Sequence, residues 1–372
     1  MSVKKVLLSE AKSGMELAQN ILDGRGHLVA ASGTILDADI IQRMENYGVI
    51  VIKVVGNSEL DDPFMEHLLY DEEEVPEEPE QENGYYEKIR NTNEFKKFNN
   101  EFDKAVGNLE IEFNDIVVKH KDINIIEFVD EVSRVIEANR TNHSILEVLD
   151  CMRGYDDLTF AHSMNVSLIC NMMAEWFGYS ETDTEMLTVG GLLHDIGKVK
   201  IPKSVLAKPG KLTDQEYRVI KYHPLLGFEI LKDQPISIKI KNAALMHHER
   251  YDGGGYPQGL KGSKIEEMAR IVAIADVYDA MTAKRVYRDK MSPFSVIEIF
   301  EKEISHYDPE ILLFFLQKIA QSYISSTVLL SNGEVGMVAM VNNSAIGRPV
   351  VMTEKGAIDL AKDRSVNIVS MV

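Results

Sequence analysis

An aspartate in the middle of an apolar helical run is the feature that most constrains how this chain can fold. Asp276 lies within the segment ARIVAIADVYDAM, residues 269–281, and most of its neighbours there are apolar. A carboxylate among apolar side chains is costly to bury unless it is paired with a charge or binds a metal ion. The fold must therefore hold this segment as a helix and bring a partner or a metal ion to Asp276.

A second apolar helical segment ends in a histidine and an aspartate. His194 and Asp195 belong to GGLLHDIGK, residues 190–198, in which the helical run ends at Gly197. HHERYDGGGYPQG, residues 247–259, opens on two adjacent histidines and continues as a glycine-rich turn that can bring backbone and a tyrosine ring to a ligand. Five of the ten histidines fall within this part of the chain: His162, His194, His223, His247 and His248.

Together, these residue types predict a metal site that holds two ions. Imidazole nitrogens and carboxylate oxygens suit iron, manganese and similar divalent ions better than metals that prefer thiolates. An aspartate beside a histidine can bridge two ions, because a carboxylate has two oxygens. Two ions about 3.5–4 Å apart can share a hydroxide and stabilise both oxygens of an in-line displacement at phosphorus. Lys198, one turn after the His-Asp pair, would lie near the leaving oxygen or the phosphate charge, so the set predicts phosphoester hydrolysis.

The chain resembles the HD-GYP family of metal-dependent cyclic di-GMP phosphodiesterases, a branch of the HD hydrolases. His194-Asp195 matches the HD motif, and Gly255-Tyr256-Pro257 matches the GYP motif. The resemblance covers about residues 150–320 and rests on HDIGKVKIP, LAKPGKLTDQE, HHERYDGGGYPQGLKG and ADVYDAMTAKRVYR. It implies a mainly α protein whose catalytic domain is an HD-type helical bundle.

The resemblance also implies roles for individual residues. Lys198 and Asp195 would be catalytic. Tyr256, Pro257, Arg285 and Arg288 would contact the dinucleotide. Apart from the resemblance, the negative net charge of the chain means that an anionic substrate needs local cations, which Lys208 and Lys211 of the KPGK loop would help to provide. The implied ligands of two divalent ions, iron or manganese, are His162, His194, Asp195, His223, His247, His248 and Asp276.

One position departs from the family pattern. Family members that hold three metals have a glutamate one helical turn before the first ligand histidine, where this chain has Leu158. Asp156 and Asp157 are near that position in sequence but out of its helical register. The departure favours two ions over three.

Plain structural roles compete with several of these assignments. Lys198 can be a cation that favours the C-terminal end of a helix dipole. Arg285 and Arg288 can belong to a solvated helix face, Tyr256 can pack beneath the glycine turn, and Asp276 can be half of an ion pair. The remaining histidines lack partner residues in the sequence and are expected to be surface or packing residues: His27, His67, His120, His143 and His306.

The predicted function is hydrolysis of cyclic di-GMP to linear pGpG, with GMP as a further product to consider. A second hypothesis keeps the site but changes the substrate to another cyclic dinucleotide or to pGpG. A third is a non-catalytic cyclic di-GMP receptor that signals through its N-terminal module or through a partner, for example a diguanylate cyclase. All seven ligand positions and Lys198 are present, which favours an enzyme.

The N-terminal part of the chain divides by composition. DEEEVPEEPEQENG, residues 71–84, holds eight acids and no base, so it repels itself and predicts an extended linker over residues 61–84. Residues 1–60 predict a small α+β module with strands at KKVLL, MELAQNIL, HLVAA and VIVIKVV and a turn at DGRG. Its helix, residues 38–47, would be capped by Asp37 and ended by Gly48.

The rest of the chain predicts three further parts. Residues 85–150 form a helical connector whose apolar stripe runs from Ile125 to Ile136 and resumes at Ile145 after a break near residues 140–143, as part of the core, as a homodimer contact or as an inter-domain stalk. Residues 151–325 form the catalytic domain, with helix starts at Thr213 and Asp308. Residues 326–372 form a short β segment with a hairpin turn at Asn332-Gly333.

Charge and cysteine usage limit the partners and the compartment. The formal net charge of −19 argues against general nucleic-acid binding, because affinity for phosphate backbones needs a basic surface. The first residues lack a sustained apolar segment, and no apolar run is long enough to span a membrane. Cys151 and Cys170 form no Cys-x-x-Cys pattern and are expected to be reduced, partly buried thiols. These features predict a cytoplasmic enzyme.

Overall fold

The computed structural model describes the chain in two compact units, Met1–Pro63 and Phe64–Val372. Residues described within them are 3–7, 11, 13–18, 20–22, 28–46, 51–55, 89–139, 145–152, 158–208, 212–282 and 291–372. Several sequence predictions fall outside these residues: the turn at 23–26, the helix end at Gly48, the linker at 61–84, the break near 140–143, and the side chains of His27, His67, His143, Lys211, Arg285 and Arg288.

In its described residues, the first unit combines short strands with helix α1. Strand β1 (Val3–Leu7) pairs with β4 (Val51–Val55), and β2 (Ile21–Leu22) pairs with β3 (Leu28–Ala30), both antiparallel. Helix α1 (Ala38–Asn46) begins after Asp37, whose Oδ1 accepts a hydrogen bond from the backbone N–H of Ile40 at 2.8 Å and confirms the predicted cap. The strand expected over residues 15–22 is confined to its last two residues, because the backbone of Leu17 bonds instead to Gly33 and Thr34.

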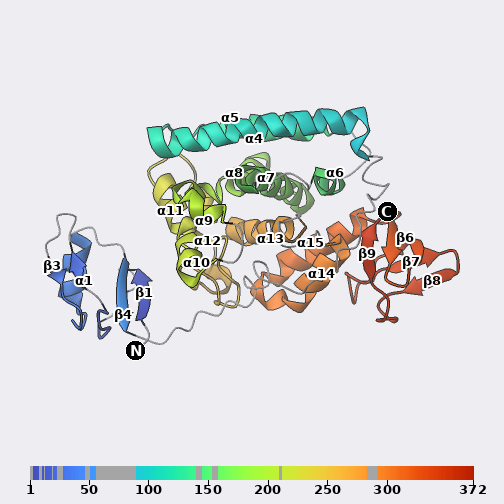
Figure 1. Ribbon diagram of the computed structural model, residues 1–372. Coiled ribbons are helices and arrows are strands. Elements are labelled where there is room, and N and C mark those ends of the chain that lie inside the picture. The colour runs from blue at the N-terminus through green and yellow to red at the C-terminus, as the bar shows by residue number, and fades with distance from the viewer. Residues whose placement is uncertain are drawn as a thin grey trace. The chain divides into compact units, whose positions relative to one another are not determined.

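The described part of the second unit includes two long helices near its N-terminal end. Helices α4 (Asn93–Lys119) and α5 (Ile125–Ala138) lie together as one layer over α7 and α8 (Figure 1). Thr92 begins α4 by accepting from the N–H of Phe95, and His120 ends it in the left-handed conformation. In α5 the predicted stripe faces inward, with Phe128, Val132 and Val135 buried in the main core. The stripe is therefore core packing.

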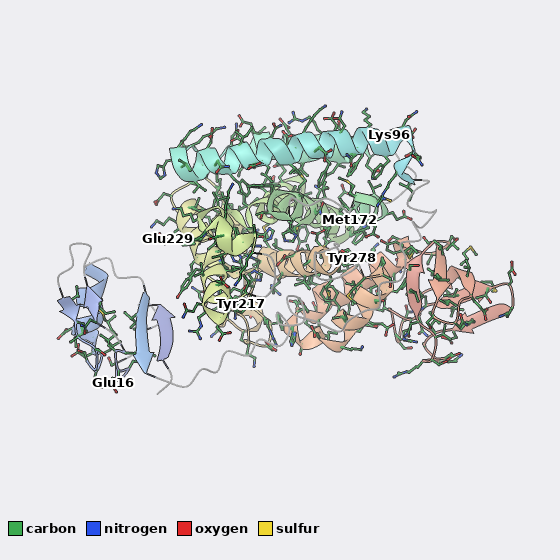
Figure 2. All side chains as sticks on the ribbon, viewed as in Figure 1. Glu16, Lys96, Met172, Tyr217, Glu229 and Tyr278 are labelled. Atoms are coloured by element: carbon green, nitrogen blue, oxygen red, sulfur yellow. The ribbon has the colours of Figure 1, made fainter. Side chains whose placement is uncertain are left out.

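The centre of this unit is built from helices that are apolar on nearly all sides. Helix α7 (Leu158–Phe177) packs on α8 (Glu181–Leu193), and both contact α13 (Glu267–Thr282). A helix buried on all sides is apolar all round, and Tyr278 of α13 is wholly buried among these elements (Figure 2). The surrounding elements are α6 (Ile145–Met152), η2 (Ile196–Lys200), α9 (Lys203–Leu206), α10 (Asp214–Ile220), α11 (His223–Leu231), α12 (Ile238–Met246) and η3 (Gly262–Lys264).

The chain closes with two helices and a sheet. Helices α14 (Pro293–Lys302) and α15 (Pro309–Ser322), with η4 (Ile304–His306) between them, lead into a five-stranded antiparallel sheet of order β8-β7-β6-β5-β9. The hairpin predicted at Asn332-Gly333 joins β5 and β6 and is confirmed. The strand bounds are β5 (Thr327–Leu330), β6 (Val335–Met340), β7 (Val350–Thr353), β8 (Gly356–Asp359) and β9 (Ile368–Met371).

Strand β8 was not predicted, because its sequence GAID carries no apolar alternation. The sheet packs on the helices, since Val328, Val338 and Val351 belong to the same core as α14 and α15. The Glu301 carboxylate also accepts hydrogen bonds from the N–H groups of Ile346 (2.7 Å) and Gly347 (3.2 Å).

Other local predictions are confirmed as well. Thr213 and Glu216 form the expected capping box of α10, and Asp308 caps α15 with a proline at its start. Cys151 in α6 and Cys170 in α7 are both buried. Among the described residues, no helix is long and apolar enough to cross a membrane. The division into five parts remains a prediction; the helices from α4 onward and the C-terminal sheet share one core.

Candidate metal centre

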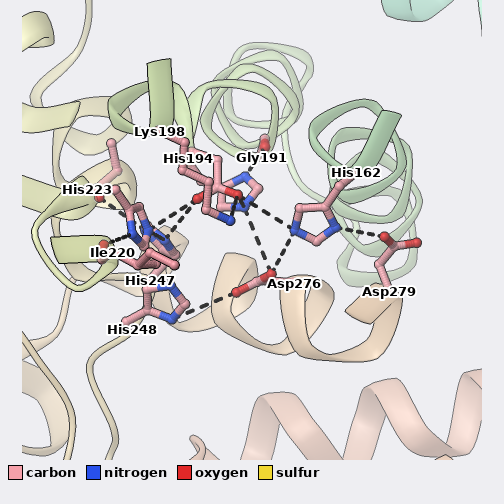
Figure 3. A network of polar contacts seen from close by, with 12 residues as sticks. His162, Gly191, His194, Lys198, Ile220, His223, His247, His248, Asp276 and Asp279 are labelled. Carbon is pink, nitrogen blue, oxygen red and sulfur yellow. Dashed lines mark hydrogen bonds and ion pairs between the residues drawn. The ribbon is translucent and has the colours of Figure 1, made fainter. Parts of the chain in front are cut away.

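The helices of the second unit bring the predicted ligand side chains together. His162 comes from α7, Asp276 from α13, and His223 from the start of α11, while His194 and Asp195 follow α8. His247 and His248 follow α12 and face the same cluster (Figure 3). Three overlapping groups have ligand atoms within 4.8 Å of one another: His223 with His247 and His248, His162 with His194 and Asp276, and His194 with Asp195 and His247.

Hydrogen bonds to the backbone determine the tautomer of three of these histidines. The Nδ1 atom of His194 lies 2.7 Å from the carbonyl oxygen of Gly191, and that of His223 lies 2.7 Å from the carbonyl of Ile220. The Nδ1 atom of His247 lies 3.1 Å from two α12 carbonyl oxygens. A carbonyl oxygen only accepts, so each Nδ1 carries the proton and each neutral ring presents the lone pair of Nε2.

These lone pairs converge without a donor between them. The Nε2 atoms of His223 and His247 are 3.1 Å apart. The Nε2 atom of His194 is fully buried and has no hydrogen-bond partner in the part of the chain that the structure describes. Converging buried acceptors that lack donors are the arrangement that a cation stabilises. The residues present therefore fit a bound metal ion.

Asp195 faces two different sets of histidines with its two oxygens. Its Oδ1 lies 3.2 Å from Nε2 of His223 and 3.8 Å from Nε2 of His247. Its Oδ2 lies 3.3 Å from Nε2 of His194 and 3.8 Å from Nε2 of His162. A carboxylate in this position could bridge two ions, and the histidines on either side of it would supply further ligands to each.

Charge and burial keep the cluster in its ligand form. Burial acts against ionisation of Asp195, but the Lys198 charge and the contact with His194 outweigh it and hold the pKa of Asp195 well below its usual range. Burial lowers the pKa of His223, and burial together with nearby histidines lowers the pKa of His247 and brings that of His248 to about 3. At neutral pH Asp195 is therefore a carboxylate and His223, His247 and His248 are neutral imidazoles, which are the metal-binding forms of these side chains.

His162 is held differently, between two carboxylates of α13. Its Nε2 lies 2.9 Å from Oδ1 of Asp276, and its Nδ1 lies 2.8 Å from Oδ2 of Asp279. Burial acts to lower the pKa of His162, but these hydrogen bonds raise it to about 9. Sequence reasoning missed Asp279, although a second carboxylate one helical turn after Asp276 in the same apolar run was a usable signal.

The glycine turn is attached to the ligand pair by its backbone. The buried Glu249 carboxylate accepts hydrogen bonds from the N–H groups of Gln258 (2.6 Å) and Leu260 (2.8 Å), a brace that sequence reasoning also missed. The N–H of Tyr256 donates to the carbonyl of His248 at 3.1 Å. Gly255 must be glycine, because a Cβ there would lie 2.2 Å from the backbone nitrogen of Arg250.

The remaining predicted site residues are only partly placed. Lys198 Nζ lies 2.5 Å from Oδ2 of Asp195, at the edge of the cluster. Lys208 Nζ lies 2.6 Å from a carboxylate oxygen of Glu216 on α10. Leu158 is the first residue of α7, four residues before His162. Arg285, Arg288 and Lys211 lie outside the described residues.

Comparison with known proteins adds to this geometry. Residues 131–311 match the model of the HD domain family. The chain is 32% identical over 226 residues to a cyclic di-GMP phosphodiesterase of Pseudomonas aeruginosa, which covers 60% of this chain and 54% of that protein. It is 34% identical over 212 residues to a 3'3'-cGAMP-specific phosphodiesterase of Vibrio cholerae, covering 56% of this chain and 39% of that protein.

A shorter and more similar stretch matches a third protein. The chain is 46% identical over 136 residues to a cyclic di-GMP phosphodiesterase response regulator of Xanthomonas campestris, which covers 36% of each chain. The matches thus span between about a third and about half of these relatives. They confirm the family resemblance and the mainly α fold that the sequence predicted.

Proposed function

We propose that this chain, which belongs to the HD domain family and carries the HD-GYP motifs, is a metal-dependent phosphodiesterase that hydrolyses cyclic di-GMP. The observation that carries the proposal is the position of Asp195, whose two oxygens face separate pairs of histidine Nε2 atoms. This arrangement suits two ions that share one carboxylate. The relatives named as phosphodiesterases of cyclic dinucleotides support the same reaction class.

The seven predicted residues would hold two ions in this arrangement. One ion would bind among His223, His247 and His248, the other among His162, His194 and Asp276, with Asp195 between them. When bound, iron or manganese ions at these positions would polarise the phosphodiester and lower the pKa of a nearby water. The carboxylates and neutral imidazoles of this chain supply the oxygen and nitrogen ligands that such ions prefer.

Lys198 is the residue proposed to act on the phosphate. Its ammonium donates to Asp195 Oδ2 and its side chain is 23% exposed, so it lies at the boundary between the buried ligands and solvent. An ammonium has three N–H donors. One can stay on Asp195 while another contacts a phosphate oxygen or gives a proton to the leaving 3′-oxygen.

Substrate recognition is proposed to involve six residues. Tyr256, Pro257 and Lys208 are the proposed contacts among the described residues, together with Arg285, Arg288 and Lys211 beyond them. The second candidate substrate is 3'3'-cGAMP, because the Vibrio cholerae relative is named as a phosphodiesterase specific for that dinucleotide. The product of either reaction would be a linear dinucleotide, and a second cleavage would give mononucleotides.

The direct test is a product assay on metal-loaded protein. Protein reconstituted with iron or manganese is incubated with cyclic di-GMP, 3'3'-cGAMP and pGpG, and the products are separated by chromatography. Turnover of cyclic di-GMP to pGpG is expected. If none of the three nucleotides is hydrolysed with either iron or manganese, an enzymatic role is contradicted and a receptor role is favoured. An Asp195→Ala variant separates these cases further, since an enzyme loses turnover while a receptor without metal dependence keeps its binding.

Metal analysis of protein purified without oxygen tests the number of ions. Two ions per chain are expected, because Leu158 stands where three-metal members of the family have a glutamate. Three ions per chain would show that another side chain replaces that glutamate.

A further inference from the structure

Four of the five clustered histidines share one method of orientation. In each, Nδ1 makes a hydrogen bond to a fixed acceptor, which is a backbone carbonyl for His194, His223 and His247 and the Asp279 carboxylate for His162. Such bonds hold the ring and aim the lone pair of the other nitrogen at a metal ion. His248 differs from all four.

In the described part of the chain, neither ring nitrogen of His248 makes a hydrogen bond. Its closest charged partner is Asp276, whose Oδ2 lies 3.9 Å from Nδ1 of His248. The ring is nonetheless enclosed, because it contacts His223 and His247 at centroid distances of 4.9 Å and 4.2 Å. These two rings are tilted against His248 by 87° and 45°. Neither lies flat on it.

Tyr256 supplies the flat contact. Its ring stacks on His248 with the centroids 4.7 Å apart and the planes only 25° from parallel. Its backbone N–H also donates to the carbonyl of His248. Tyr256 thus contacts His248 through both its backbone and its ring. The stacked ring restricts rotation of the His248 imidazole, whose nitrogens make no hydrogen bond in the described part of the chain.

The position of Tyr256 is itself constrained from three directions. The Nζ atom of Lys221 lies 4.6 Å from the centroid of the Tyr256 ring, a cation–π distance. Gly255 packs so tightly on the backbone of Arg250 that the turn has no room to shift there. The buried Glu249 carboxylate holds the far end of the turn. The stack is therefore part of a fixed structure.

We propose that Tyr256 is a positioning residue for His248, and that its stacked ring replaces the hydrogen-bond anchor that the other four histidines have. This inference rests on the proposed metal-binding role of His248. It assigns the tyrosine of the glycine turn a task in assembling the metal centre, which differs from the substrate contact predicted from sequence. Lys221 contributes to that task because its ammonium contacts the Tyr256 ring, which in turn stacks on His248.

The test measures metal affinity, so it does not depend on knowing the substrate. Full-length protein is stripped of metal and titrated with Mn²⁺ by calorimetry or against a chromogenic chelator. Tyr256→Leu is expected to weaken Mn²⁺ binding at one of the two proposed sites by about tenfold. This is the usual loss of affinity when a residue that orients a metal ligand is removed. Tyr256→Phe keeps the ring and is expected to bind Mn²⁺ within about twofold of the unaltered protein.

A matched control lies in the same turn. Tyr251→Leu makes the same chemical change five residues earlier, where the ring makes no aromatic contact with a histidine among the described residues. It is expected to leave Mn²⁺ affinity unchanged. In a His248→Ala background, Tyr256→Leu is expected to have no further effect, because the residue that it positions is absent.

The outcomes separate the alternatives. If Tyr256 only contacts substrate, Tyr256→Leu raises KM and leaves Mn²⁺ affinity intact, which overturns the inference. If Tyr256→Leu fails to fold, Lys221→Met decides, since a loss of affinity of a few-fold supports the stack and an unchanged affinity overturns it. Failure of the proposed phosphodiesterase activity would appear as Mn²⁺ binding without turnover, and the affinity comparison would still stand.

Discussion

The Nδ1 atom of His162 lies 2.8 Å from the Oδ2 atom of Asp279, inside the contact between α7 and α13. Asp279 is 2% exposed and Asp276 lies one helical turn before it. The two carboxylates hold the same imidazole by its two nitrogens. A ligand histidine oriented by a carboxylate is more basic and has a defined tautomer. If His162 binds metal as proposed, Asp279 would orient it from the side of the ring opposite Asp276 (Figure 3).

Asp279→Ala is expected to weaken metal binding by about 10- to 100-fold, because His162 loses the acceptor that orients it. Asp279→Asn keeps an acceptor oxygen and should show a smaller loss. Metal titration of the stripped protein measures both. Asp359→Asn, at the end of strand β8 in the C-terminal sheet, is the control. Equal affinities for the Ala variant and the unaltered protein would mean that α7 alone orients His162.

The metal-free protein is expected to lose stability as the pH rises from about 6.5 to about 9. The pKa of His162 is raised from 6.5 to about 9 in the folded state. Protonated His162 therefore stabilises the folded protein fully below pH 6.5, and this stabilisation is lost as the pH rises through about 9. The loss is at most on the order of 3 kcal/mol. Urea unfolding across this range measures it, and Asp279→Asn should show a shallower decline. A flat profile in the unaltered protein would contradict the His162 assignment.

Gly197→Ala is expected to disrupt the centre by displacing a helix. An added Cβ would lie 2.0 Å from the carbonyl oxygen of His223 and 2.5 Å from the backbone nitrogen of Gly227. Because both neighbours are backbone, α11 must move, at a cost of about 1–3 kcal/mol or more. Thermal unfolding and metal content should both fall.

Gly107→Ala is the matched control for that substitution. Gly107 lies on the exposed face of α4, and a Cβ there meets nothing within 4 Å, so alanine should stabilise the helix by up to about 1 kcal/mol. If Gly197→Ala were as well tolerated as Gly107→Ala, the packing of η2 on α11 would not be what positions His223.

Lys198→Met is expected to leave the metal content near that of the unaltered protein and to lower kcat by about 10²- to 10⁴-fold, because the residue is proposed to act on the phosphate and not to bind metal. The readout pairs metal analysis with steady-state kinetics on cyclic di-GMP. Lys200→Met, an exposed lysine at the end of η2, is the control and should retain activity. If Lys198→Met also loses metal, the role of Lys198 would instead be to hold the Asp195 carboxylate in position for metal binding.

Much of this protein could be predicted from local sequence. The apolar stripe of α5, the caps at Asp37, Thr213 and Asp308, and the hairpin at Asn332-Gly333 depend on residues close together in the chain, where spacing determines which side chains can meet. The ligand types at the candidate centre were also readable, because buried histidines and aspartates in apolar runs require partners.

Only the tertiary structure decided how those ligands are arranged. The two oxygens of Asp195 face histidines from α7, α11 and the ends of α8 and α12. These histidines are separated by up to 85 residues in sequence, from His162 to His247, and meet only through helix packing. The same packing placed Asp279 behind His162 and the Tyr256 ring on His248. Sequence thus determined which chemical groups are present, whereas their orientation depended on long-range contacts that no local pattern encodes.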